Sequence, residues 1–490
     1  MARQSASPRG IGRGETAEGQ IETPIFVLLM AVAAVVIAGI HLYFQNFSLT
    51  IAVSASLLAF GATIFRVEYG LYLLLIAMLL SPEIEYGEVG TDAGRGLNLR
   101  YDDVLIVVIF LGVIVKHTFE GLPLYWRNSP INAAIVAYYG VCLFSTLLAL
   151  RISVQAWDRD MAFFVLMKML EFYLIFFMVG MAVTSMTEVR RQLRVFFAVS
   201  LVVGIYGIVS IGTQPRVSAP FEAGGTEPNT FGGYLMIVMM LAISLASYSP
   251  RAGLRAGLFT IAGLTAVPFI WTLSRASYVA FAATLIAWGI TTRRYWVFPV
   301  LVALLIAAPI IMPDKVVHRV QSTIEPSGVP INVPFAGEVK IDKSAYERVY
   351  VWEKVQHNLT VWPFFGGGVA WGAILDSQFA RVVIETGIFG SCTFAFLLWR
   401  ILRSTRETYY WSRDWVAKAL AAAMFAITIG LMVHSLGTIS YLIVRIMEPY
   451  WFLLALITVS RQIAILDHQQ RRAEAARAAG PLAATRPAAA

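Results

Sequence analysis

The strongest constraint on the fold is a long succession of apolar segments, many of them near the length that crosses a lipid bilayer. Hydrophobic residues make up 58% of the 490 residues and charged residues only 14%, whereas a soluble protein carries about 25% charged residues. Backbone groups in hydrocarbon must find hydrogen bonds within their own segment, so such segments form helices. We therefore predict an all-α, polytopic membrane protein with about 14 transmembrane helices. The predicted spans are residues 25–43, 51–65, 71–80, 104–115, 131–150, 161–183, 195–211, 234–246, 258–271, 276–290, 297–311, 391–402, 417–431 and 443–459.

One long polar stretch, residues 312–376, interrupts this pattern and must leave the bilayer as a loop. Most of the 38 Lys and Arg residues fall in alternate loops, and the positive-inside rule assigns those loops and both termini to the cytoplasm. The stretch 312–376 then faces outward. We expect four regions: a cytoplasmic N-terminus (1–22), N-terminal transmembrane helices (23–194), a second membrane region that contains the outward loop (195–460), and an Ala- and Arg-rich cytoplasmic tail (461–490).

Several function classes lack their sequence signals. No G-x-x-x-x-G-K-[ST] loop is present, which argues against an intrinsic ATPase. No His/Cys cluster has zinc spacing, and Cys142 and Cys392 lie in apolar segments as small core residues. The net charge of +8 reflects the cytoplasmic loops rather than a nucleic-acid partner. We therefore expect no metal, no cofactor and no nucleic acid.

Two short outward-facing motifs carry candidate binding residues. Asn229 begins a span and would cap its helix, but Glu227 and Arg216 nearby are left unexplained by capping. Ser274 and Arg275 form a near-zero-length turn between two spans. Arg275 either snorkels to the headgroup level or holds a lipid phosphate by bidentate hydrogen bonds.

The outward loop and its exit carry further candidates. Arg348 and Trp352 are four residues apart, which places them on one face of a predicted amphipathic helix that would lie along the membrane surface. Asp376 ends the loop, where a carboxylate would act as a base or orient an acceptor. Arg381 and Glu385 have the same spacing and form either a self-neutralising pair or part of a substrate site.

Charged residues also occur deep within predicted spans. Lys168 with Glu171, and Arg445 with Glu448, have i, i+3 spacing, which suits internal pairing, although intramembrane charge often marks function. His434 lies at an outward helix end, where we expect a hydrogen-bonded structural histidine.

The order of these motifs resembles the O-antigen ligase and polymerase superfamily of membrane glycosyltransferases. The similarity covers about residues 195–450, and a Lys-x-x-Glu helix at Lys168 is similar as well. The segments that carry it are Pro228-Asn229, Ser274-Arg275, Arg348 to Trp352, Gly366 to Gly368, and Glu385-Thr386-Gly387 to Gly390. Ligase-type members carry His-Asn where this chain has Asp376-Ser377, so the sequence looks more like the polymerase branch.

The resemblance implies a GT-C-like fold and an inverting, metal-independent transfer in a bacterial inner membrane. A glycan on polyprenyl diphosphate would serve as donor, with a second lipid-linked glycan as acceptor. Arg275 and Arg348 would stabilise the leaving diphosphate, with Arg216 and Arg319 as weaker candidates. Asp376 would accept or orient the proton of the attacking hydroxyl.

The expected function is therefore the polymerisation of lipid-linked repeat units into an exopolysaccharide, capsule or O-antigen, together with a flippase and chain-length or export proteins. Three alternatives stay open: an O-antigen ligase acting on lipid A-core, a transporter or flippase of lipid-linked sugars, and a non-catalytic scaffold. A transporter would need a polar path through the bilayer midplane. A scaffold would tolerate alanine at Arg275 and Arg348.

Overall fold

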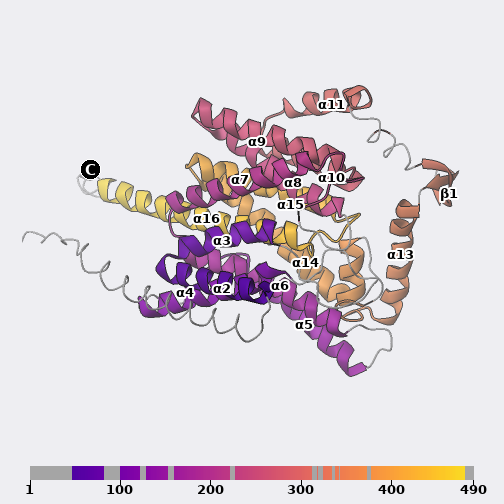
Figure 1. Cartoon of the computed structure of the whole chain (residues 1–490), viewed down its shortest axis with the longest axis horizontal. Coiled ribbons are helices and arrows are strands. Elements are labelled where there is room, and N and C mark those ends of the chain that lie inside the picture. The colour runs from indigo at the N-terminus through magenta and orange to yellow at the C-terminus, as the bar shows by residue number, and fades with distance from the viewer. Residues whose placement is uncertain are drawn as a thin grey trace, which may run out of the picture. The chain divides into compact units, whose positions relative to one another are not determined.

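The computed structural model of the chain describes residues 47–81, 100–121, 128–152, 159–220, 227–311, 317, 324–333, 337–341, 343–371 and 377–479. These residues form helices and one small sheet (Figure 1). The helices are α2 (Phe47–Phe65), α3 (Val67–Leu80), α4 (Tyr101–Phe119), α5 (Asn132–Ile152), α6 (Arg159–Ala182), α7 (Met186–Val209), α8 (Pro228–Tyr248), α9 (Ala252–Trp271), α10 (Arg275–Thr292), α11 (Val297–Ile311), α13 (Lys343–Val361), α14 (Gln378–Trp411), α15 (Trp415–His434) and α16 (Val444–Ala479).

The membrane prediction is confirmed in its coarse form. Within the described residues, eight helices are long and apolar enough to cross a membrane, namely α5, α6, α7, α8, α9, α14, α15 and α16. Every predicted span falls on a helix except residues 25–43, which lie outside the described part of the chain. By helix length and hydropathy, the chain is a multi-pass membrane protein. The tail beyond residue 460 continues α16 as a helix to Ala479.

The chain divides into two compact units. Residues 1–73 and 107–124 form the first, and residues 74–106 and 125–490 form the second. In the first unit, Gly70 and Gly112 both pack against Thr63, where a Cβ on Gly70 would lie 2.2 Å from Thr63 Oγ1. Lys116 Nζ donates to the carbonyls of Ile64 and Phe65 and so caps the end of α2.

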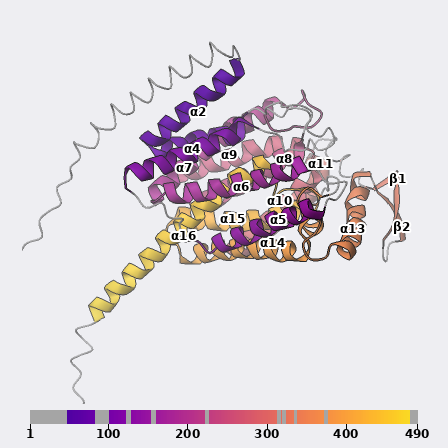
Figure 2. The same ribbon diagram turned by 90° about the horizontal axis from the view of Figure 1, so that it is seen from below.

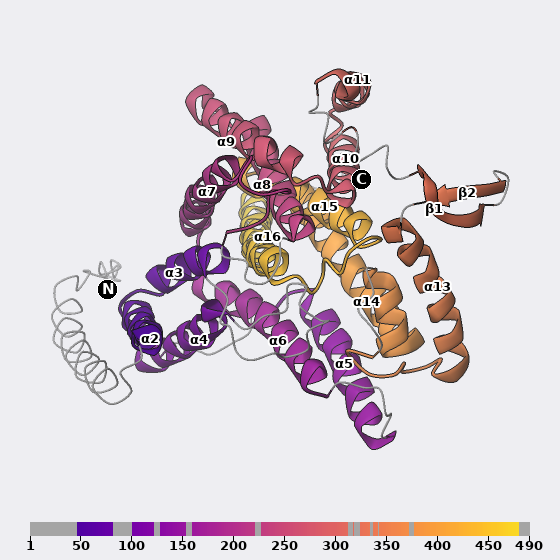
Figure 3. The same ribbon diagram turned by 45° about the vertical axis from the view of Figure 1, so that its right-hand side comes forward.

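The second unit is built around α8, whose apolar segment is 89% buried. Figure 3 shows α9, α10, α15 and α16 around it. Two glycines in the first turns of α8 permit this packing. A Cβ on Gly232 would lie 2.4 Å from Ser277 Oγ, and a Cβ on Gly233 would lie 2.4 Å from Ile446 Cδ1. Similarly, Gly430 lets α15 approach Thr284 of α10.

The described part of the outward loop contains a sheet as well as a helix. Strands β1 (Ile324–Val333) and β2 (Gly337–Ile341) pair antiparallel, so the all-helical prediction missed one hairpin. The amphipathic helix is confirmed as α13, and its apolar face packs on α14 through Val351 and Val355 against Ala380 and Ile384. Figure 2 shows α13 beside α14, next to the strands, and the position of α13 along the membrane surface stays a prediction.

Candidate functional site

A chain of polar side chains joins the start of α8, the start of α10 and the end of α15. Ser274 Oγ donates to Asn229 Oδ1 at 2.7 Å and lies 2.8 Å from Ser277 Oγ. Ser277 Oγ lies 3.0 Å from His434 Nε2, and His434 Nδ1 lies 2.7 Å from Ser440 Oγ. Except for the half-buried Asn229, all of these residues are buried. We call this set the Asn229–His434 network.

The directions of the hydrogen bonds in the Asn229–His434 network can be worked out by starting from Ser274. Ser274 uses its single hydroxyl hydrogen on Asn229, so Ser277 must donate to Ser274. Ser277 Oγ then accepts from His434 Nε2–H, and the other ring nitrogen, Nδ1, lies within hydrogen-bond distance of Ser440 Oγ. The contacts at both nitrogens fix the orientation of the ring. The expectation of a hydrogen-bonded histidine is confirmed.

The expectation that Asn229 caps α8 is wrong. Glu227 occupies the N-cap position without a side-chain cap, Pro228 is the first helical residue, and Asn229 lies within the first turn. The Asn229 side chain instead accepts from Ser274. Glu227 Oε2 accepts from Thr230 Oγ1 at 3.0 Å. The sequence motif at the start of α8 therefore serves contacts with another helix rather than its own terminus.

A strained turn positions Arg275. Leu273 has a positive φ of 53°, a conformation that costs a non-glycine residue about 1 kcal/mol. Arg216 Nε donates to the Thr272 carbonyl at 3.1 Å, and an Arg216 terminal nitrogen donates to the Leu273 carbonyl at 3.1 Å. Ser274 then caps α10 by accepting from Ser277 N–H. The turn therefore fixes the half-buried Arg275 at the first position of α10.

The exit of the outward loop meets the same network. The Gln378 backbone N–H donates to the carbonyls of Ser435 and Thr438, at 3.0 and 3.1 Å. The buried atoms Ser377 Oγ, Gln378 Oε1 and Ser435 Oγ have no hydrogen-bond partner among the described residues. Buried polar atoms are nearly always paired, so these three atoms keep hydrogen-bonding capacity that the described residues do not use. Asp376, directly before Ser377, lies outside the described residues.

The glycine-rich stretch packs onto a break in α14. Gly387 has φ 63° and ψ −156° and divides α14 into two helical parts. Gly367 N–H and Gly368 N–H donate to the carbonyls of Ile384 and Glu385, at 3.0 and 2.9 Å. Ser145 Oγ of α5 also donates to the Glu385 carbonyl, at 2.7 Å. The glycine-rich stretch and the motif that begins at Glu385 therefore pack against each other.

Arg381 and Glu385 lie where the glycine-rich loop packs on α14. Arg381 Nε donates to Glu385 Oε1 at 2.6 Å, and the same oxygen accepts from Ala370 N–H at 2.9 Å. Both side chains are buried. The self-neutralising pair is confirmed, and it ties the loop to α14. Trp352 is exposed on α13, whereas the Arg348 side chain and all of Arg319 lie outside the described residues.

The two intramembrane pairs have different outcomes. Lys168 Nζ pairs with Glu171 at 3.3 Å, as expected, and also with Asp103. Glu448 makes no such pair with Arg445: neither of its carboxylate oxygens has a hydrogen-bond partner in the described structure. An Arg445 terminal nitrogen instead donates to the Leu79 carbonyl at 3.2 Å.

A cavity of about 580 Å³ lies at the opposite helix ends, near the starts of α7, α9 and α15. Arg190, Arg194 and Arg251 contribute its cationic lining, and Leu258 and Trp415 contribute apolar walls. It is therefore separate from the Asn229–His434 network.

Sequence reasoning missed Ser277, Thr438 and Ser440 as partners of His434. Their signal was weak: Ser277 follows Ser274 by three residues, one helical turn, and Thr438 and Ser440 follow the histidine in a short connection. No protein-family model matches the chain, and the comparison with curated proteins finds no similar sequence. The resemblance to the O-antigen ligase and polymerase superfamily therefore rests on the motifs alone.

Proposed function

We propose that this protein is a membrane glycosyltransferase that polymerises polyprenyl-diphosphate-linked repeat units at the outer face of a bacterial inner membrane. One observation carries the proposal: segments 228–229, 274–275, 377–378 and 434–440, far apart in sequence, meet in one hydrogen-bonded cluster. Three of these segments include or adjoin the motifs that resemble the superfamily. Their convergence is what a shared substrate site requires.

Arg275 is assigned to the leaving group. Cleavage of the bond from the anomeric carbon to the lipid diphosphate leaves negative charge on the departing phosphate, which a guanidinium stabilises with paired hydrogen bonds. The strained turn before Arg275 is held by two hydrogen bonds from Arg216. Because the turn is already fixed, Arg275 loses less conformational freedom when it binds the diphosphate. Arg216 is a positioning residue in this scheme, because two of its donors hold that turn. Arg348 supplies a second cation from α13.

Asp376 is assigned to the attacking hydroxyl. The acceptor oxygen forms a bond to the anomeric carbon while the bond to the diphosphate breaks, and the hydroxyl proton passes to the Asp376 carboxylate. The residues next to Asp376 offer buried oxygens at Ser377 and Gln378 that have no hydrogen-bond partner among the described residues. Sugar hydroxyls of a bound substrate would donate hydrogen bonds to these oxygens. This scheme requires no metal ion.

An O-antigen ligase is the second candidate, favoured by a specific observation. Ligase-type members of the resembling superfamily use a histidine at the position of Asp376, and here the buried His434 supplies an imidazole to the cluster. The polymerase is preferred because both ring nitrogens of His434 already bind serines, which leaves this imidazole without a lone pair for substrate.

The proposal is tested in a deletion strain of the source organism. Wild type, Arg275→Ala, Arg348→Ala and Asp376→Ala are expressed at matched membrane levels, and polysaccharide and lipid-linked intermediates are sized. Arg472→Ala is the control, because Arg472 is exposed on the extension of α16. We expect each site variant to leave single repeat units on the lipid carrier and the control to make full-length polymer.

Two results would contradict the proposal. Long polymer that accumulates on the carrier without reaching its final acceptor identifies a ligase. Unchanged polymer length and amount in all three variants excludes a catalytic role for these residues and favours a transporter or scaffold.

A further inference from the structure

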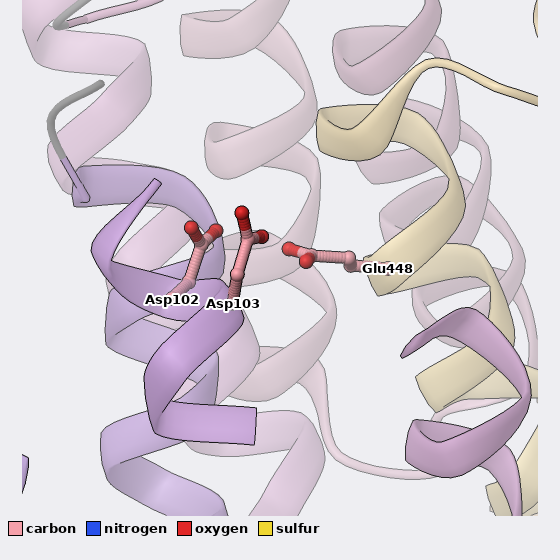
Figure 4. A group of neighbouring side chains, drawn as sticks. All are labelled: Asp102, Asp103 and Glu448. Atoms are coloured by element: carbon pink, nitrogen blue, oxygen red, sulfur yellow. The ribbon is translucent and has the colours of Figure 1, made fainter. Parts of the chain in front are cut away.

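A second cluster of buried polar side chains lies in the second compact unit of the chain, and it takes no part in the proposed reaction. Among the described residues it contains three cationic side chains, Arg100, Lys168 and Arg445, which interact electrostatically with Asp102, and four carboxylates, Asp102, Asp103, Glu171 and Glu448. Asp102, Asp103 and Glu448 each offer one oxygen, and these three oxygens lie within 4.8 Å of one another. Figure 4 shows the Glu448 carboxylate of α16 pointing toward the two aspartates of α4.

Each of the two aspartates contacts cationic or N–H groups through one carboxylate oxygen, Oδ2. Asp102 Oδ2 pairs with an Arg100 terminal nitrogen at 3.3 Å, and Asp103 Oδ2 accepts from the Arg100 backbone N–H at 2.8 Å and pairs with Lys168. The second oxygen of each, Oδ1, has no hydrogen-bond partner among the described residues. Three of the four carboxylate groups therefore approach one another with free lone pairs.

Glu448 is the independent sign of a ligand. It is 0% exposed, and both of its oxygens are without a hydrogen-bond partner in the part of the chain that the structure describes. Burying an ionised carboxylate without a partner is among the costliest arrangements in a protein. Its orientation toward two other carboxylates increases that cost, unless a positive charge lies between them.

We propose that Asp102, Asp103 and Glu448 bind one monovalent metal cation of the size of Na⁺. Within the part of the chain that the structure describes, four carboxylates against three cationic side chains leave a single negative charge, which a monovalent ion neutralises and a divalent ion exceeds. Three oxygens no more than 4.8 Å from one another can all lie within about 2.8 Å of a central ion, close to the range of about 2.3–2.6 Å for oxygen ligands of Ca²⁺, an ion of nearly the same radius as Na⁺. This inference does not depend on the proposed function.

The test measures thermal unfolding of the full-length protein in detergent by the fluorescence of its 12 tryptophans. NaCl is titrated against N-methylglucamine chloride at constant ionic strength, with CaCl₂, MgCl₂ and pH as separate series. We expect Tm to rise with Na⁺ and to saturate. Glu448→Gln should lose this response and, without Na⁺, should unfold at a higher temperature than wild type, because the neutral amide removes an uncompensated charge.

Glu407→Gln is the matched control, since Glu407 pairs with Arg403 and Arg461 outside the cluster and should keep the Na⁺ response. Saturation by Ca²⁺ or Mg²⁺ but not Na⁺ would overturn the proposal. So would stability that rises as pH falls with no effect of Na⁺, since a shared proton then supplies the charge. A wild-type Tm indifferent to every cation would also overturn it, whatever the variants do.

Discussion

Replacing Gly366 by alanine should destabilise the protein by about 3 kcal/mol or more. Gly366 has φ 67°, which costs an alanine about 1 kcal/mol. A Cβ there would lie 2.4 Å from the Glu385 carbonyl carbon and 2.5 Å from Ile384 O and Thr386 N. These are backbone atoms and cannot rotate away, so the loop must move. That movement breaks the hydrogen bonds of Gly367 and Gly368 to α14, worth about 1 kcal/mol each.

Thermal unfolding in detergent measures this effect, with Gly140→Ala as the control. Gly140 lies within α5, and a Cβ there meets nothing within 4 Å. Because alanine is the better helix former, the control should match or exceed the wild-type Tm. If Gly366→Ala and Gly140→Ala unfold at the same temperature, then the loop does not dock on α14 as described, and the account of the glycine motif fails.

Two further substitutions probe the polar contacts by the same assay. His434→Ala removes one hydrogen-bond partner from each of the buried serines Ser277 and Ser440 and should cost about 2 kcal/mol, whereas the exposed His468→Ala should not change Tm; equal effects would refute the network. Glu385→Gln leaves the Arg381 cation buried and should cost about 3 kcal/mol, and adding Arg381→Gln should restore part of the loss; additive losses would show that the pair is not coupled.

The helices could be predicted from the sequence because hydrocarbon solvent imposes one solution on an apolar segment. Pattern alone also located the amphipathic helix at Arg348 to Trp352. It did not reveal that the apolar face of this helix packs on α14, because Val351 and Val355 suit a lipid surface equally well. The β1–β2 hairpin was missed because β1 contains Pro326 and Pro330 and lacks the strict alternation that marks a half-buried strand, while β2 is only 5 residues long.

The contacts between distant helices could not be derived from local spacing. Arg445 and Glu448 have the spacing of a pair on one helix, yet Arg445 binds a carbonyl of α3 and Glu448 points toward α4. Lys168 does pair with Glu171, but its second partner, Asp103, lies on α4 and is invisible to an i, i+3 rule. Such choices depend on how helices pack, which a single sequence does not specify.

The short segment from His434 to Glu448 joins the two polar clusters. Its first residue lies in the Asn229–His434 network, and its last faces the carboxylates of α4. Between them, Ile446 packs closely on Gly233 of α8, where an added Cβ would lie 2.4 Å from Ile446 Cδ1. This contact fixes the first turn of α16 to the helix that carries Asn229. A cation bound at Glu448 would therefore also stabilise the first turn of α16, which packs on the helix that carries Asn229, and this gives the buried charge cluster a reason to lie beside a site that uses no metal.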